Sequence, residues 1–141
     1  MTTVTYATVE APGDWPEPLR AEFHTDRGNG RVGSRLVSQS ERVRVWHLSL
    51  RPGERLGFHT HVLDYFWTAV TGGKARSRYG DGNIVEVSYE PGDTRHHHFG
   101  TGAFMIHDLT NIGETELVFT TVEFLDSANP ALALDEAAQA A

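Results

Sequence analysis

From residue 31 onward, the chain is built of short runs of β-branched and aromatic residues separated by turn-forming residues at fairly even spacing. This pattern is typical of an all-β sandwich or barrel. Asp81-Gly82, between two such runs, is the clearest hairpin signal. We therefore expect strands near residues 32–38, 42–50, 65–70, 74–79, 83–88, 93–98, 103–109 and 115–125.

The two ends of the chain differ in composition from the β-rich part between them. Residues 1–30 are rich in proline, glycine and charge, which predicts an irregular N-terminal arm with at most one or two helical turns between Glu17 and Phe23. Residues 127–141 are rich in alanine and predict a frayed helix or a disordered tail. Residues 31–126 are thus expected to form one domain, a small jelly-roll β-barrel of two antiparallel sheets.

Composition and charge exclude several classes of function. The 141 residues include no cysteine, which excludes disulfide frameworks, thiolate zinc sites and thiol nucleophiles. The net charge of −7, without any block of Lys or Arg, argues against a nucleic-acid partner. Met1 to Pro18 lacks a basic segment and an apolar run, and no apolar stretch is long enough to span a bilayer. We expect a soluble, cytoplasmic protein without a membrane partner.

Histidines are the most distinctive feature of the chain, because six of the eight lie between residues 59 and 107. His59 and His61 are expected at the start of a strand, where the two-residue period of side chains puts both on one face. Firm binding of a divalent metal such as Fe, Mn, Ni or Zn needs at least one further ligand. The candidates for that third ligand are His107, His96 and His98.

The spacing around the histidine pair resembles a known motif. Gly53-x5-His59-x-His61-x3-Tyr65-x6-Gly72 is similar to the first motif of the cupin superfamily, in which a glutamate stands where this chain has Tyr65. The resemblance implies the small, single-domain cupin barrel over about residues 36–125. A shorter likeness, His59-x-His61-x2-Asp64-Tyr65, is to small cupins of β-alanine breakdown.

A second stretch resembles the second cupin motif. Pro91-Gly92-Asp93 looks like the turn that leads into it, and His107-x3-Asn111 looks like its end, so the resemblance favours His107 as the third ligand. Between these segments the chain is longer than the family pattern and contains three consecutive histidines, residues 96–98. The family's glutamate ligand has two candidate replacements, Tyr65 on the face of the histidines and Asp64 if the turn after His61 shifts the register.

A sphere of three neutral imidazoles leaves the charge of a divalent metal uncompensated and therefore favours a small anionic organic ligand. The arrangement resembles the three-histidine cupin dioxygenases, which implies a metal-dependent enzyme with dioxygenase-like chemistry. Isomerases and decarboxylases also occur on the fold, and a ligand-binding cupin without turnover is the alternative from another class.

Three residues are further candidates for the chemistry of the site. The hydroxyl of Tyr65 is a candidate hydrogen-bond donor or general acid, and His96 and His98 are candidates for proton transfer if they point inward. His97, on the alternate face, is expected to be solvated or hydrogen-bonded. Phe66 and Val70 should form an exposed apolar stripe, which predicts a homodimer.

Overall fold

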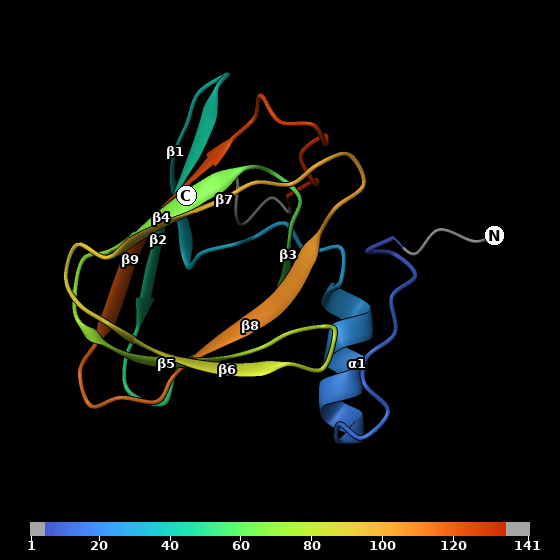
Figure 1. The fold of residues 1–141 in the computed structure, drawn as a ribbon, viewed down its shortest axis with the longest axis horizontal. Coiled ribbons are helices and arrows are strands. Elements are labelled where there is room, and N and C mark those ends of the chain that lie inside the picture. Colours follow the sequence, from blue (N-terminus) through green and yellow to red (C-terminus); the bar gives the residue numbers. More distant parts are fainter. Residues whose placement is uncertain (1–4, 135–141) are drawn as a thin grey trace.

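The computed structural model describes residues 5–134 and is almost entirely β. One helix precedes nine strands within these residues (Figure 1). The elements are α1 (Glu17–Asp26), β1 (Arg35–Gln39), β2 (Val43–Leu50), β3 (Arg55–His61), β4 (Tyr65–Ala69), β5 (Gly73–Arg78), β6 (Ile84–Tyr89), β7 (Thr94–His97), β8 (Met105–Asn111) and β9 (Leu117–Phe124).

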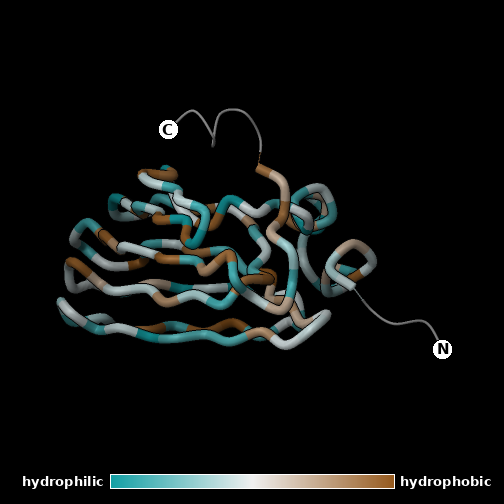
Figure 2. The backbone as a smooth tube through the Cα atoms, turned by 90° about the horizontal axis from the view of Figure 1, so that it is seen from above, coloured by the Kyte–Doolittle hydropathy of each residue, from teal (hydrophilic) through white to brown (hydrophobic). Residues whose placement is uncertain are grey.

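The strands form two antiparallel sheets, as the sequence predicts for a jelly roll. The larger sheet has the order β1-β2-β9-β4-β7 and the smaller one the order β3-β8-β5-β6. In Figure 2 the strands lie side by side as a stack, and the coiled N-terminal part lies beside it. Consecutive strands pass repeatedly from one sheet to the other, so the two sheets close a barrel whose inward side chains come from both.

All eight expected strands are present, with ends shifted by at most three residues. The hairpin prediction is confirmed: Arg78 pairs with Ile84, and Gly82 between them has a φ of 94°, which favours glycine. The ninth strand, β3, lies outside the eight expected ranges. His59 and His61 were expected at the start of a strand and instead lie at the end of β3, whose pairing with β8 is irregular between Leu56 and His59.

The inner core occupies one end of the barrel. Leucine, alanine and phenylalanine side chains from both sheets are buried there, and Trp67 and Tyr89 pack against them. The Trp67, Tyr89 and Phe119 rings meet edge to face at centroid distances of 4.9–5.4 Å. The histidines lie at the other end of the barrel.

The N-terminal arm is more ordered than the sequence predicts. Helix α1 has ten residues and covers the outer face of the smaller sheet, where Phe23 packs against Phe58 of β3 and Ile106 of β8. The Trp15 ring stacks on Phe58 at 5.5 Å. The helical turns expected between Glu17 and Phe23 are present and continue to Asp26, because Phe23 packs on the large apolar side chains of the outer face of β3 and β8.

The C-terminal segment is described only to residue 134. Residues 129–134 contain no helix, and Leu134 packs against a cluster of Val32, Leu36 and Trp46 at the edge of the larger sheet. The expected tail over residues 135–141 lies outside the described residues.

The outer face of the larger sheet carries the predicted apolar stripe. Phe66 is half-buried beside Phe124, and Val70 is 54% exposed. The homodimer stays a prediction. Within residues 5–134, no helix has both the length and the apolar character that crossing a bilayer demands.

Candidate metal centre

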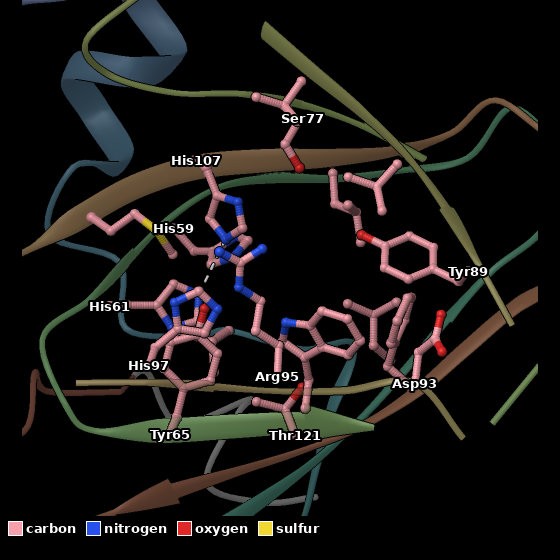
Figure 3. A pocket seen from close by; sticks show the side chains of 18 of the residues that line it. His59, His61, Tyr65, Ser77, Tyr89, Asp93, Arg95, His97, His107 and Thr121 are labelled. Atoms are coloured by element: carbon pink, nitrogen blue, oxygen red, sulfur yellow. Dashed lines mark hydrogen bonds between the residues drawn. The ribbon is translucent and has the colours of Figure 1, made fainter. Parts of the chain in front are cut away.

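Three imidazoles meet inside the barrel at the end opposite the inner core. His59 and His61 come from β3, and His107 comes from β8 directly opposite His59 in the antiparallel ladder. Figure 3 shows the three rings converging on one point of the pocket. The structure thus brings together the three histidines that the sequence analysis favoured as metal ligands.

The nitrogen atoms of these rings lie at the separations that a single cation would need. One ligand atom from each of the three lies within 4.8 Å of the others. Nε2 of His61 is 3.2 Å from Nε2 of His107, the contact that is dashed in Figure 3. With metal–nitrogen bonds of about 2.0–2.1 Å, donors at such separations can share one ion.

The protonation state of the cluster suits metal binding. His59 donates its Nδ1 hydrogen to the carbonyl of Gly57 at 2.9 Å, which leaves the lone pair on Nε2. Burial lowers the pKa of His59 to about 4 and holds the pKa values of His61 and His107 well below their ordinary range. All three rings are therefore neutral at pH 7, the form that coordinates a metal.

His61 and His107 are positioned by ring stacking. Their Nδ1 atoms are buried and have no hydrogen-bond partner among the described residues. His61 stacks on Tyr65 at 4.1 Å, and His107 stacks on Tyr79 at 5.2 Å. The facing Nε2 atoms fit a divalent metal bound through nitrogen, because the cation would accept a lone pair from each ring in place of the one hydrogen bond between them.

The two candidates for the missing glutamate lie on different sides. Tyr65 faces the histidines and is buried, and this burial raises the pKa of its hydroxyl far above the ordinary value, so the group is a proton donor at neutral pH. Asp64 points away, where its carboxylate accepts a hydrogen bond from the Phe99 amide at 2.8 Å and pairs with His98 at 3.0 Å. Among the described residues, no carboxylate joins the three imidazoles.

The orientation expected for the three consecutive histidines is reversed. His97 lines the pocket and stacks on Tyr65 at 4.6 Å, whereas the side chains of His96 and His98 are exposed outside it. His96 lies against Phe66 on the outer face of the larger sheet, and His98 pairs with Asp64. The expectation that His96 or His98 points inward was therefore wrong.

A bulge in β3 explains this reversal. Gly53 and Gly92 have φ values of 84° and 91° and occupy equivalent turns. In β3 the residues Gly57 and Phe58 oppose the single residue Asp108, so His59 faces inward at the sixth position after the glycine. The ladder of β7 is regular, and the inward position is therefore the fifth, where His97 stands.

The histidines form one wall of a cavity of about 620 Å³ between the sheets. Tyr65, Tyr79 and Ser77 add hydroxyl groups near them, and Trp67 and Phe119 form the apolar wall toward the inner core. Sequence reasoning missed Arg95, whose side chain extends into this cavity (Figure 3). The signal that would have found it is its two-residue spacing from His97 on one strand.

Charged residues on the outer face of the smaller sheet hold the two histidine-bearing strands together. Asp108, next to His107, accepts hydrogen bonds from the guanidinium groups of Arg55 and Arg78 at 2.8–2.9 Å. Arg55 also makes two hydrogen bonds of 2.6 and 2.7 Å to Glu22 of α1. Glu22 in turn accepts a hydrogen bond from the Phe58 amide at 3.2 Å, beside His59. Helix α1 is thereby attached to the outer face of β3 and β8, the two strands that carry the histidines.

No model of a known protein family matches the chain, and no curated protein matches it. Solved structures do resemble it. A cupin domain from Bordetella pertussis Tohama I is 26% identical with a TM-score of 0.56, and the match covers 63% of this chain and 88% of that one. A protein with a double-stranded β-helix domain from Klebsiella pneumoniae is 24% identical with a TM-score of 0.53, covering 71% and 82%. An RmlC-like cupin family protein from Methanocaldococcus jannaschii is 19% identical with a TM-score of 0.52, covering 64% and 76%.

Proposed function

Because the chain has the cupin fold, with three histidines gathered inside the barrel, we propose that it is a metal-dependent enzyme acting on a small anionic organic molecule. Dioxygenase-like chemistry is favoured over isomerisation or decarboxylation. The observation that carries the proposal is the convergence of three neutral imidazoles, within 4.8 Å, on a cavity of about 620 Å³. A cavity of this size accommodates a small substrate beside the ion.

His59, His61 and His107 would hold the metal, which when bound supplies Lewis acidity and, if it is iron or manganese, reactivity toward oxygen. Three imidazoles leave positions open on a four- to six-coordinate ion, and they do not neutralise its charge. An anionic substrate therefore gains both a coordination site and charge compensation. The protonated hydroxyl of Tyr65, which lines the same cavity, can donate a hydrogen bond to that substrate.

Metal analysis tests the ligand assignment. We expect about one metal ion per chain in protein purified without chelator or reconstituted with Fe(II), Mn(II), Ni(II) or Zn(II). His59→Ala and His107→Ala should each reduce the metal content severely, because two imidazoles do not hold such an ion firmly. His98→Ala is the matched control, since its exposed side chain lies outside the cavity, and should keep the parent's metal content. Stoichiometric metal in both ligand variants would contradict the assignment.

Oxygen uptake tests the reaction class. The Fe(II)-loaded protein is expected to consume oxygen with members of a panel of small carboxylates and diketones. If the metal-loaded protein takes up no oxygen with any member of the panel, this result would contradict dioxygenase chemistry. Isomerisation and decarboxylation would then be the reactions left to test. The absence of a carboxylate ligand among the described residues favours one alternative, a ligand-binding cupin without turnover. Failure of the parent to take up any of the four metals would support that alternative.

A further inference from the structure

We infer that Arg95 binds the carboxylate of the substrate, and that the apolar wall beyond it takes a planar hydrophobic body. The inference rests on the proposed function and narrows its substrate class to hydrophobic carboxylates, such as aryl or unsaturated acids. The observation behind it is the juxtaposition, inside one cavity, of an aromatic wall and a guanidinium that forms no ion pair with the residues the structure describes.

Arg95 lies on β7 directly opposite Trp67 of β4, and its side chain extends into the cavity on the side of the histidines (Figure 3). No ion pair joins it to any carboxylate within residues 5–134. Arg55 and Arg78 of the opposite sheet, by contrast, share the buried carboxylate of Asp108. A guanidinium that extends into a cavity and has no ion-pair partner among the described residues is a ready partner for an anion, which it binds through two parallel hydrogen bonds.

Among the described residues that line the cavity, a single carboxylate competes with an anionic ligand for the guanidinium. Of the described residues that line it, only Asp93 carries a carboxylate, and one oxygen of that group accepts a hydrogen bond from the Glu90 amide at 2.9 Å within the turn before β7. A cation held by the three histidines would lie in the same cavity as Arg95. An anion between them would relieve the repulsion between these two positive charges.

The larger sheet also presents an apolar surface to the cavity, beside Arg95. Trp67 and Phe119 present ring surfaces to it, with Tyr89 edge to face against both. Val85 and Val87 of the edge strand β6 line the mouth of the cavity, although their side chains are 42% and 39% exposed. Apolar surface left open beside an anion site favours a ligand that covers it, at about 25 cal/mol per Å² removed from water.

The same residues indicate where a ligand would enter the cavity. Strand β6 is one edge strand of the smaller sheet and β7 one edge strand of the larger, and they contribute apolar and cationic side chains to the same cavity. A hydrophobic carboxylate entering between them would place its charge on the side of Arg95 and its body against Val85 and Val87. This arrangement discriminates against small hydrophilic anions, which cover none of the apolar surface.

Calorimetric titration with 2-naphthoate, its neutral amide 2-naphthamide and acetate tests the inference, in both metal-free and Zn(II)-loaded protein. We expect 2-naphthoate to bind most tightly. Arg95→Gln should weaken 2-naphthoate binding about 10-fold to 100-fold and leave 2-naphthamide unchanged, because the loss is that of a charge-assisted pair. The double variant Val85→Ser, Val87→Ser should weaken 2-naphthoate about 3-fold to 10-fold without affecting acetate.

Arg76→Gln is the control, since it removes an arginine that is exposed on β5 and paired with Glu86 outside the cavity. It should bind all three probes like the parent. Equal affinity for acid and amide, an Arg95→Gln effect on both, or no binding of 2-naphthoate would overturn the inference. If the protein takes up no metal but Arg95→Gln still abolishes the preference for the acid, the carboxylate site stands and the proposed enzymatic function fails.

Discussion

Replacing Asp108 with asparagine is expected to lower the free energy of unfolding by about 3 kcal/mol. The Asp108 side chain is almost fully buried, and its carboxylate accepts hydrogen bonds from two guanidinium groups and from the Arg78 amide at 2.7 Å. Asparagine keeps the volume and one acceptor, but it leaves Arg78 without an ion-pair partner among residues 5–134 and Arg55 with the carboxylate of Glu22 alone. Both arginines keep roughly a quarter of their side-chain surface exposed, which places the loss at the lower end for a broken buried pair.

Urea denaturation of the metal-free protein at pH 7 measures this loss. Glu86→Gln is the control, because it breaks an ion pair to Arg76 whose two side chains are 46% and 45% exposed, and it should change the stability by no more than about 1 kcal/mol. Equal effects of the two substitutions would contradict the role assigned to Asp108. Because Asp108 adjoins His107, we also expect weaker metal binding in Asp108→Asn, measured by competition with a chromophoric chelator.

Glu123 is expected to lower the free energy of unfolding of the parent by about 3 kcal/mol as the pH rises toward neutrality. Replacing Glu123 with glutamine should remove this loss. Glu123 faces the interior of the larger sheet with an exposed fraction of only 3%, and its carboxylate accepts a hydrogen bond from the Trp46 indole at 2.7 Å. Burial raises the pKa of Glu123 from its ordinary value of 4.5 to about 7. Glutamine has the same shape and still accepts the indole hydrogen bond, so the substitution removes chiefly the buried charge.

The direction of the effect follows from proton binding. Between pH 4.5 and pH 7, folded Glu123 keeps a proton that the unfolded chain has lost. The stabilisation from this group is complete below pH 4.5 and is lost as the pH rises through about 7. The stability of Glu123→Gln relative to the parent should therefore rise by about 3 kcal/mol over this interval, since one pKa unit corresponds to about 1.4 kcal/mol.

Denaturation curves of parent and variant, recorded from pH 4.5 to pH 7.5 without metal, measure this difference. The comparison cancels the opposite contribution of the neutral histidines, which are present in both proteins. Glu116→Gln, in an exposed position just before β9, removes the same charge from the surface and should leave the pH profile like that of the parent. A constant difference between Glu123→Gln and the parent at all pH values would contradict the assigned burial of an ionisable carboxylate.

Local sequence patterns were sufficient for most of the fold. Alternation of apolar and polar residues acts through the two-residue period of a strand, so the runs around residues 43–50 and 117–124 indicate strands without knowledge of their partners. Turn glycines act in the same local way, as Gly82 and Gly92 show by their positive φ values. Helix α1 was underestimated because its stability comes from Phe23 packing on the sheet, a contact that no local pattern reveals.

The candidate site, too, could be predicted from local sequence patterns only in part. The spacing of His59 and His61 and the resemblance to the cupin motifs singled out the three histidines that the structure brings together. The orientation of residues 96–98 was wrong because it depends on the phase of each strand, and the bulge at Gly57 and Phe58 shifts that phase in β3 but not in β7. A bulge is defined by pairing with another strand and leaves no reliable mark in its own sequence.

By itself, the sequence determined eight of the nine described strands, their turns, the absence of thiol chemistry and the histidines available to a metal, because these depend on residue type and short-range spacing. Only the tertiary structure decided that Asp64 points away, that His97 faces inward, and that Arg95 enters the cavity without an ion pair to any carboxylate of residues 5–134. The physical reason is that charge compensation and side-chain direction depend on neighbours brought together across two sheets from distant parts of the chain.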